Sequence, residues 1–246
     1  MFAFQHSVGS IDLAFTDRHG GLSSGAWSSL NFGTSNGDDP DLVDANMRRV
    51  AEEFDVPLEH LVRMSQYHGT DVVVADATTN MSHGVPAGDA LVTATPGVAL
   101  LVRVADCTPV VLADARAGVV AVVHAGRNGM ADGITPATVG VMRDLGAAEI
   151  SAWIGPRACG ACYEVPAQMR DEISASVPEA WAVTSWGTPA LDVGAGVAAQ
   201  LDALGVQSVD LADGDSTCTI EDERFFSYRR QGQQSGRLGA LVRCRP

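Results

Sequence analysis

Short apolar runs separated by tight turns constrain this chain more than any other feature. Between residues 89 and 126 the runs DALVT, GVALLVRVAD, TPVVLAD and GVVAVVHAG follow one another with only a few residues between them. Runs that are rich in Val and Leu and bounded by Gly or Pro are typical of buried strands. Parallel neighbours in a sheet need a crossover of about a dozen residues, and several of these connections are shorter. We therefore expect mixed sheets instead of a doubly wound parallel sheet.

Helical patterns lie on both sides of these strands. Asp39 is a suitable N-cap for a helix that starts at Pro40, and residues 133–147 repeat the pattern, with Thr135 as the cap and Gly146 at the end. Further helices are expected at VPAQMRDEISASV and VGAGVAAQLDALGV. Further strands are expected at EISAWIGP, at residues 238–242, and on both sides of the turn in VRMSQYHGTDVVVAD. The 246 residues include 46% hydrophobic residues and no Pro- or Ser-rich linker. The expected fold is a single α+β domain over residues 1–246, with mixed sheets and outer helices.

Charge and composition exclude several classes of function. The formal net charge of −14 repels phosphate backbones, so nucleic acid is not an expected partner. All 16 basic residues are arginine, and Schiff-base chemistry, pyridoxal phosphate anchoring and P-loop nucleotide binding each need a lysine. No apolar run reaches the roughly 18 residues of a membrane span, and the N-terminus lacks the pattern of a signal peptide. A cytoplasmic protein without a membrane partner is expected.

His68, Cys107 and His124 share one local setting. Each follows apolar strand material and precedes a Gly or Pro turn, which places all three at strand ends. Two imidazoles and one thiolate with an open fourth position are typical of catalytic zinc sites. For any one of these residues alone, a satisfied interior polar group is the favoured interpretation, so the metal site depends on the three occurring together.

The other cysteines carry a weaker signal. Cys159 and Cys162 form a C-x-x-C motif, which occurs in redox and zinc sites, but no second such pair follows it. Incidental thiols are therefore the favoured interpretation of this pair. We assign no role to Cys218 and Cys244.

An arginine cluster near the C-terminus is a candidate anion site. Arg229, Arg230 and Arg237 lie close together in FFSYRRQGQQSGR, and the guanidinium fork suits phosphate or carboxylate. A solvated basic loop explains the same cluster equally well. The aromatic residues beside it either stack on a flat ring or pack the domain.

Taken in order, several motifs resemble one family. TDRHGGLSSGAWSSLNFG, QYHGTDV, DALVT, VADCTPVVLAD, VVHAG, IGPRACGACYEV and FFSYRR are similar to motifs of the laccase-domain family, also called the multicopper polyphenol oxidase or YfiH-like family. Its members include purine nucleoside phosphorylases, and the resemblance extends from about Phe15 to Val242. It implies an α/β/β/α layered domain similar to cysteine-hydrolase-like toxins. It also implies that His68, Cys107 and His124 are the zinc ligands at the catalytic centre.

One motif departs from the family pattern. The family usually continues HAGWRG where this chain has HAGRNG, so Arg127 stands at the tryptophan position and Asn128 at the arginine position. If the family arginine binds an anion, either Arg127 substitutes for it from one position away or the affinity for the anion is lower. The departure concerns anion binding more than the metal.

The resemblance implies phosphorolysis of adenosine, inosine, guanosine and methylthioadenosine, with adenosine deamination at the same site. Bound zinc lowers the pKa of its water to about 7, which would supply hydroxide for attack at C6 of adenosine. Phosphorolysis also needs phosphate to be held beside the sugar, and arginine is suited to hold it. We expect nucleoside and phosphate as ligands, with Arg18, Arg229 and Arg230 as candidates for phosphate binding.

Two other functions use the same residues. Cys107 as nucleophile and His124 as base would form an amidase that edits peptidoglycan precursors, the activity implied for a bacterial branch of the family. A copper polyphenol oxidase is disfavoured, because six histidines without an H-x-H pair do not supply a trinuclear site besides a His2Cys site. Copper remains an alternative occupant of the His2Cys site, since it outcompetes zinc for such ligands.

Overall fold

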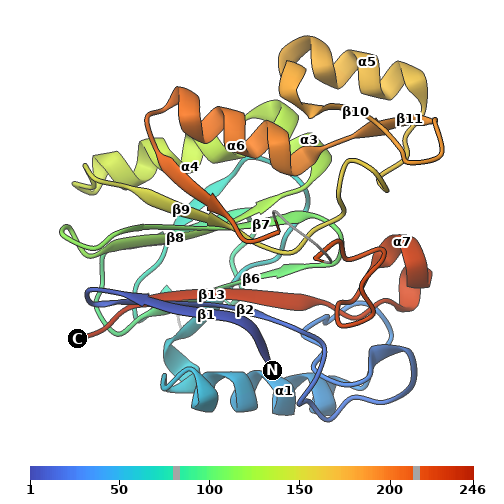
Figure 1. The fold of residues 1–246 in the computed structure, drawn as a ribbon. Coiled ribbons are helices and arrows are strands. Elements are labelled where there is room, and N and C mark those ends of the chain that lie inside the picture. The colour runs from blue at the N-terminus through green and yellow to red at the C-terminus, as the bar shows by residue number, and fades with distance from the viewer. Residues whose placement is uncertain (80–83, 213–216) are drawn as a thin grey trace.

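Two mixed sheets stacked face to face form the centre of the fold (Figure 1). The computed structural model describes residues 1–79, 84–212 and 217–246. The first sheet has the order β1 (Phe2–Val8), β2 (Ile11–Thr16), β13 (Leu238–Cys244), β6 (Ala99–Val104) and β3 (Leu61–Arg63). The second has the order β12 (Gln207–Asp210), β9 (Ser151–Ile154), β7 (Thr108–Asp114), β8 (Val119–Ala125), β5 (Ala90–Thr93) and β4 (Val72–Val74). A separate hairpin joins β10 (Trp181–Val183) and β11 (Pro189–Leu191).

Both sheets combine parallel and antiparallel pairs, as the short connections predict. The pairs β3–β6, β4–β5 and β12–β9 are parallel, and the remaining pairs are antiparallel. All seven residues of β7 and all seven of β8 are buried, which is why these strands read as continuous apolar runs.

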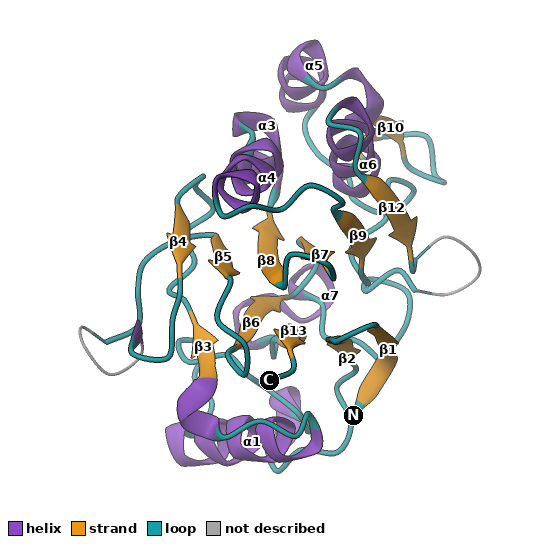
Figure 2. Ribbon diagram, turned by 90° about the vertical axis from the view of Figure 1, so that its left-hand side faces the viewer, coloured by secondary structure: helices purple, strands orange, loops and turns teal. Residues whose placement is uncertain are grey.

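Helices cover the outer face of each sheet (Figure 2). The longer helices are α1 (Pro40–Glu53) on the first sheet, α4 (Ile134–Asp144) and α6 (Val193–Ala203) on the second, and α5 (Ala167–Ser176) beside the hairpin. The short ones are α3 (Arg127–Asp132), α7 (Tyr228–Gln231) and the 3-10 turns η1 (Gly25–Trp27), η2 (Leu58–His60), η3 (Pro178–Ala180) and η4 (Gly232–Gln234). The α/β/β/α layering is therefore confirmed. Within the described ranges, no helix is both long and apolar enough to cross a membrane.

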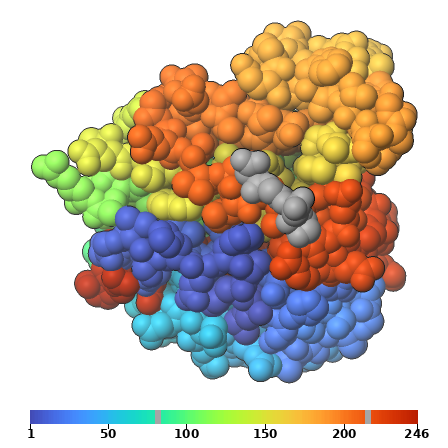
Figure 3. Space-filling view, viewed as in Figure 1, coloured from blue at the N-terminus to red at the C-terminus, as the bar shows by residue number. Residues whose placement is uncertain are grey.

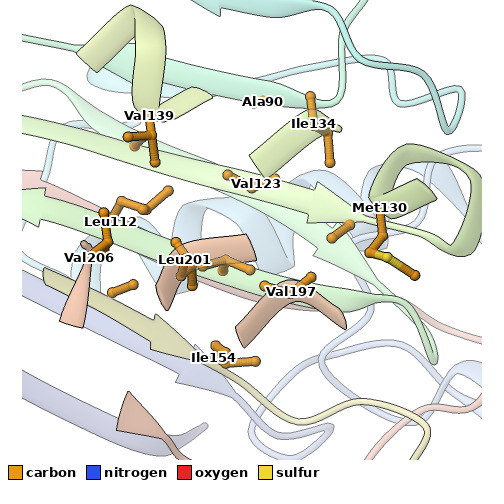
Figure 4. Packing of buried hydrophobic residues seen from close by; sticks show 14 of the residues in the cluster. Ala90, Leu112, Val123, Met130, Ile134, Val139, Ile154, Val197, Leu201 and Val206 are labelled. Atoms are coloured by element: carbon orange, nitrogen blue, oxygen red, sulfur yellow. The ribbon is translucent and has the colours of Figure 1, made fainter. Parts of the chain in front are cut away.

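Three apolar clusters hold the layers together. In the cluster between the outer helices and the second sheet, Val139 of α4 and Leu201 of α6 lie against Leu112 (Figure 4). Between the sheets Leu100 and Val122 belong to a second cluster, and α1 closes a third against the first sheet. Truncation of such a buried aliphatic side chain to alanine costs about 2–5 kcal/mol, so these clusters stabilise the frame that carries the strand ends.

The chain crosses from the first sheet to the second at two places that matter for the site. The predicted strands on either side of the turn at residues 66–71 are present, but β3 belongs to the first sheet and β4 to the second. The link from β6 to β7 makes the same crossing through Asp106 and Cys107. Because β3 and β6 are parallel neighbours, both crossings leave the first sheet at the same edge.

One predicted helix cap is wrong. The Asp39 cap is confirmed, since its carboxylate accepts a hydrogen bond from the Asp41 amide. The helix assigned to Thr135 instead begins at Ile134, with Gly133 as its N-cap. Gly133 has a φ of 92° and is also the C-cap of α3, a left-handed conformation that favours glycine. Thr135 therefore lies inside the first turn of the helix.

Candidate functional site

His68, Cys107 and His124 converge at the edge where the two crossings meet; we call them the His2Cys cluster. One potential ligand atom from each lies within 4.8 Å of the others. The Cys107 Sγ is 3.7 Å from His68 Nε2, and the two imidazole rings stand edge to face with centroids 4.7 Å apart. The residues come from the two crossings and from the end of β8, three segments that are distant in the chain.

Asp89 connects the two histidines, and the analysis of the sequence missed it. Its carboxylate is fully buried and lies 2.7 Å from His124 Nδ1. It also accepts hydrogen bonds from the backbone N–H groups of His68, at 3.0 Å, and Gly69, at 2.7 Å. A carboxylate does not donate, so Nδ1 carries the proton and Nε2 is left as the ligand atom. The available signal was the aspartate that opens the motif DALVT at the start of a buried strand.

Hydrogen bonds hold this carboxyl in its charged form. Burial acts to raise the pKa of Asp89, but the hydrogen bonds from His124 and from the backbone outweigh it, so that pKa lies below its usual value. Fixed charge at this position keeps the His124 ring oriented. The Asp89 carboxylate also holds the backbone of His68, whose φ of 66° lies in the left-handed region that residues other than glycine rarely adopt.

Cys107 is in a setting that favours its thiolate. Burial acts to raise its pKa, but the charge and hydrogen bond of His124, with a smaller contribution from His68, lower that pKa to about 6. For His124 burial acts to lower the pKa, and the facing Cys107 and Asp89 raise it to about 9. A thiolate beside oriented imidazoles suits a metal ligand, and it also suits a nucleophile.

A glycine makes room for the cluster. A Cβ atom at Gly126 would lie 2.6 Å from His68 Cδ2 and 3.4 Å from Cys107 Sγ. Any larger residue at this position would displace the His68 ring. The glycine after His124 is therefore required by the close approach of the ligand side chains.

The His2Cys cluster opens into a cavity of about 590 Å3, a size typical of sites for small molecules. Its wall also contains several polar and aromatic groups, among them Asn36, Gln66, Tyr163 and Tyr228. Four arginines line it as well: Arg103, Arg127, Arg229 and Arg237. In a chain with a net charge of −14, this concentration of cations makes the cavity suited to an anionic ligand.

The structure separates the predicted arginines. Arg229 lines the cavity, stacks over the Tyr163 ring at 4.4 Å and donates a hydrogen bond to a backbone carbonyl. Arg18 donates to two backbone carbonyls and stacks over Phe226. Arg230 donates to four backbone carbonyls. Neither Arg18 nor Arg230 is among the residues that line the cavity, and phosphate binding by them stays a prediction.

Arg103 is the cavity arginine that pattern analysis overlooked. It interrupts the apolar run of β6, which was the signal available in the sequence. Burial, together with the charges of Arg63 and Arg237, lowers its pKa to about 10. In the part of the chain that the structure describes, its Nε is buried without a hydrogen-bond partner, while its other two nitrogens donate to Phe32, Thr34 and Met64.

Comparisons with known proteins find relatives that match nearly the whole chain. The chain is 49% identical to a purine nucleoside phosphorylase, ORF3, of Streptomyces griseus, over 96% of this chain and 95% of that protein. It is 48% identical to the purine nucleoside phosphorylase SCO2081 of Streptomyces coelicolor, over 98% and 99% of the two chains. The crystal structure of YlmD from Geobacillus stearothermophilus superposes with a TM-score of 0.85 at 33% identity, covering 96% of this chain and 93% of that one.

A second solved structure and a family profile complete the comparison. YfiH of Bacillus licheniformis superposes with a TM-score of 0.84 at 25% identity, covering 96% and 93% of the two chains. The profile of the family described as multi-copper polyphenol oxidoreductase laccase matches residues 12–245. That match spans nearly the whole chain and includes every motif on which the resemblance depends. The chain therefore belongs to this laccase-like family, together with YlmD and YfiH.

Proposed function

We propose that the chain is a zinc-dependent purine nucleoside phosphorylase whose metal ligands are His68, Cys107 and His124. The relatives at 48–49% identity that carry this activity in their names support it. The observation that carries the proposal is the placement of a His2Cys cluster and four arginines around one cavity of about 590 Å3. A metal ligand set and an anion site then face the same bound molecule.

The donor atoms fit zinc. Tetrahedral zinc with bonds of about 2.3 Å to sulfur and about 2.0 Å to nitrogen sets these ligand atoms about 3.5 Å apart. The Cys107 Sγ to His68 Nε2 distance is 3.7 Å. The hydrogen bond from His124 Nδ1 to Asp89 is the outer-shell contact that usually orients a zinc-bound imidazole.

The other cavity residues bind and orient the reactants. Arg229 and Arg237 offer guanidinium groups for phosphate at the wall of the cavity. Tyr228 lines the cavity and is half exposed, so its ring is available to stack on a purine. In phosphorolysis a phosphate oxygen forms the new bond to C1′ while the bond from C1′ to the purine breaks and the purine leaves with a proton. Holding both substrates in one cavity makes this step effectively intramolecular, which lowers its barrier.

We propose adenosine deamination as a second activity of the same cavity. Zinc held by His68, Cys107 and His124 would supply a Lewis acid for the replacement of the 6-amino group by water, with release of ammonia. Inosine and adenine are then the expected products from adenosine, depending on whether water or phosphate attacks. Guanosine, inosine and methylthioadenosine are the further expected substrates of phosphorolysis.

One observation favours a second candidate function. The lowered pKa of Cys107, about 6, together with His124 beside it, is what a cysteine amidase acting on cell-wall peptides requires. A zinc-bound thiolate is not a free nucleophile, so the two functions compete for Cys107. A multicopper oxidase is not proposed, because within the described ranges the groups of metal-binding residues contain only two histidines, His68 and His124.

The experiment is a product assay with adenosine and phosphate on untagged protein, with metal content measured on the same sample. We expect adenine and inosine from the wild type, and loss of both products together with the metal of the His2Cys cluster in Cys107→Ala. Cys244→Ser is the matched control, since Cys244 is a buried thiol outside the cavity, and it should keep full activity. Full turnover and a zinc content equal to that of the wild type in Cys107→Ala would refute the assignment. A metal-free wild type whose Cys107 is rapidly alkylated would favour the amidase.

A further inference from the structure

A second group of potential metal ligands lies outside the His2Cys cluster. It consists of Cys159, Cys162, Cys218 and Glu221, and we call it the cysteine cluster. One ligand atom from each residue lies within 4.8 Å of the others. Tetrahedral zinc with sulfur bonds of about 2.3 Å holds its sulfurs about 3.8 Å apart. The four donors are therefore already gathered to the dimensions that one ion requires.

Two facing turns build the cysteine cluster, and both present their ligands with the same spacing. In the first turn, the backbone N–H groups of Cys162 and Tyr163 donate to the Cys159 carbonyl at 3.0 and 2.9 Å. In the second, the N–H groups of Glu221 and Asp222 donate to the Cys218 carbonyl at 3.1 and 2.8 Å. A ligand separation of three residues on a tight turn places both side chains on one side, as in the C-x-x-C halves of zinc sites.

Backbone pairing fixes the two turns against each other. Arg157 and Cys218 form a parallel bridge, and the Thr219 N–H donates to the Arg157 carbonyl at 3.0 Å. The Cys159 N–H points at Cys218 Sγ at 3.4 Å. Backbone N–H groups that donate to sulfur favour the thiolate that a metal needs. The sequence alone did not pair Cys218 with the C-x-x-C motif, because 55 residues separate Cys162 from Cys218.

We propose that Cys159, Cys162, Cys218 and Glu221 bind a structural zinc ion. Three thiolates and one carboxylate complete four-coordination without an open position, which distinguishes this site from the His2Cys cluster. A disulfide uses only two of the three sulfurs and leaves the third unpaired, whereas one ion uses them all. Cys162 and the neighbouring Ile220 line a surface cavity, which gives the ion a path of entry.

The zinc would hold together two walls of the active-site cavity. Ala158 and Tyr163, on either side of the first turn, line the cavity. The second turn connects to a further part of the cavity wall through Thr219, whose hydroxyl donates to Asp106 at 2.7 Å, and Asp106 in turn accepts the Arg229 N–H at 2.6 Å. Figure 3 shows the segment around α7, in red-orange tones, lying at the surface between the N-terminal part and the α5 region. The proposal does not depend on which reaction the cavity carries out.

The test uses the full chain with the double substitution His68→Ala/Cys107→Ala, which removes two ligands of the His2Cys cluster. After dialysis against a weak chelator, we expect mass spectrometry to find about one zinc per chain, and about two in the wild type. Exchange for Co2+ should give the charge-transfer absorption of a site with several thiolates. A metal-free double variant overturns the proposal, and so does a native mass lower by two hydrogens, which indicates a disulfide.

The outcomes separate this proposal from the proposed function. Suppose that the wild type holds about one zinc and the double variant keeps it. This result supports zinc at the cysteine cluster and refutes a metal in the His2Cys cluster. A wild type with about one zinc that the double variant loses refutes the cysteine cluster and leaves the proposed function intact. Both stoichiometries are read without any activity measurement.

Single variants give an independent readout. Cys162→Ser should lose one zinc and unfold at a lower temperature that responds less to chelator than that of the wild type, because structural zinc binding is coupled to folding. Cys244→Ser, the buried thiol outside the cluster, should keep its zinc. Glu221→Gln should release zinc to a chelator faster than the wild type. Unchanged zinc content and release in both cluster variants would overturn the proposal, and if Cys162→Ser does not fold, the double variant decides.

Discussion

Replacement of the buried Asp89 by asparagine tests how the His2Cys cluster is positioned. The Asp89 carboxylate accepts hydrogen bonds from His124 Nδ1 and from the N–H groups of His68 and Gly69. Asparagine keeps the shape but turns one acceptor into an NH2 group, which then faces one of these donors. The side chain would no longer hold both histidines at once.

The size of the effect follows from these contacts. Loss of a hydrogen bond to a charged group costs about 1.5–3 kcal/mol, and loss of an outer-shell partner weakens metal binding about 10- to 100-fold. We therefore expect Asp89→Asn to bind zinc at the His2Cys cluster at least 10-fold more weakly. At about 2–4 °C per kcal/mol for a chain of this size, the unfolding temperature should fall by several degrees.

The assay is chelator competition for the zinc that Cys107→Ala lacks, followed by thermal unfolding with and without zinc. Asp114→Asn is a matched control, because Asp114 is also buried and accepts backbone hydrogen bonds from residues outside the cavity. It should lose a similar amount of stability and bind zinc normally. If Asp89→Asn holds this zinc as tightly as the wild type, Asp89 does not position the ligands.

Three further predictions concern the cavity. Gly126→Ala places a Cβ 2.6 Å from His68 Cδ2, so we expect loss of the His2Cys metal and at least about 10-fold lower activity, together with about 1–3 kcal/mol lower stability from overcrowding. Metal analysis measures the first effect, the product assay the second and thermal unfolding the third. Arg229→Ala should raise the KM for phosphate, whereas Arg230→Ala should mainly lower the unfolding temperature, because Arg230 donates to four backbone carbonyls; steady-state kinetics at varied phosphate separates the two. In metal-stripped protein the thiolate of Cys107 disappears as the pH falls through its pKa of about 6, so its alkylation rate should be half-maximal near that pH and not near 8.5.

Controls and contrary results for these three are available in the same chain. Gly140→Ala is the control for Gly126→Ala, because a Cβ at Gly140 meets no atom within 4 Å, and it should keep metal and activity. Equal KM values for phosphate in Arg229→Ala and the wild type would remove Arg229 from the anion site. An alkylation midpoint above pH 8 would show that the imidazoles do not stabilise the Cys107 thiolate.

Local sequence was sufficient for much of the architecture. The apolar runs over residues 89–126 indicated buried strands because strands covered on both faces tolerate few polar residues. The short links between them indicated mixed sheets because parallel neighbours require long crossovers. The start of α1 was equally readable, since Asp39 and Pro40 act on their own first turn. Thr135 was misassigned because the left-handed Gly133 joins two helices, a conformation that neighbouring residue types did not specify.

The sequence predicted only part of the candidate site, because contacts between residues that are distant along the chain leave no local pattern. His68, Cys107 and His124 stood out because each follows a strand and precedes a turn, a local feature. Asp89 did not, since its role is a contact with His124, 35 residues away. Motifs cannot state such a contact, because it exists only once two strands are paired.

The arginines and cysteines show the same division. The basic cluster near the C-terminus identified Arg229, but only folding showed that Arg230 turns to backbone carbonyls while Arg103, from a buried strand, reaches the cavity. The C-x-x-C pair had no partner in the sequence until the bridge between Arg157 and Cys218 brought the third thiol to it.

The sequence by itself determined which segments become strands and helices, because propensity, capping and periodicity act within a few residues. The tertiary structure alone decided which donors share a site, because that depends on how the sheet crossings bring distant segments to one edge.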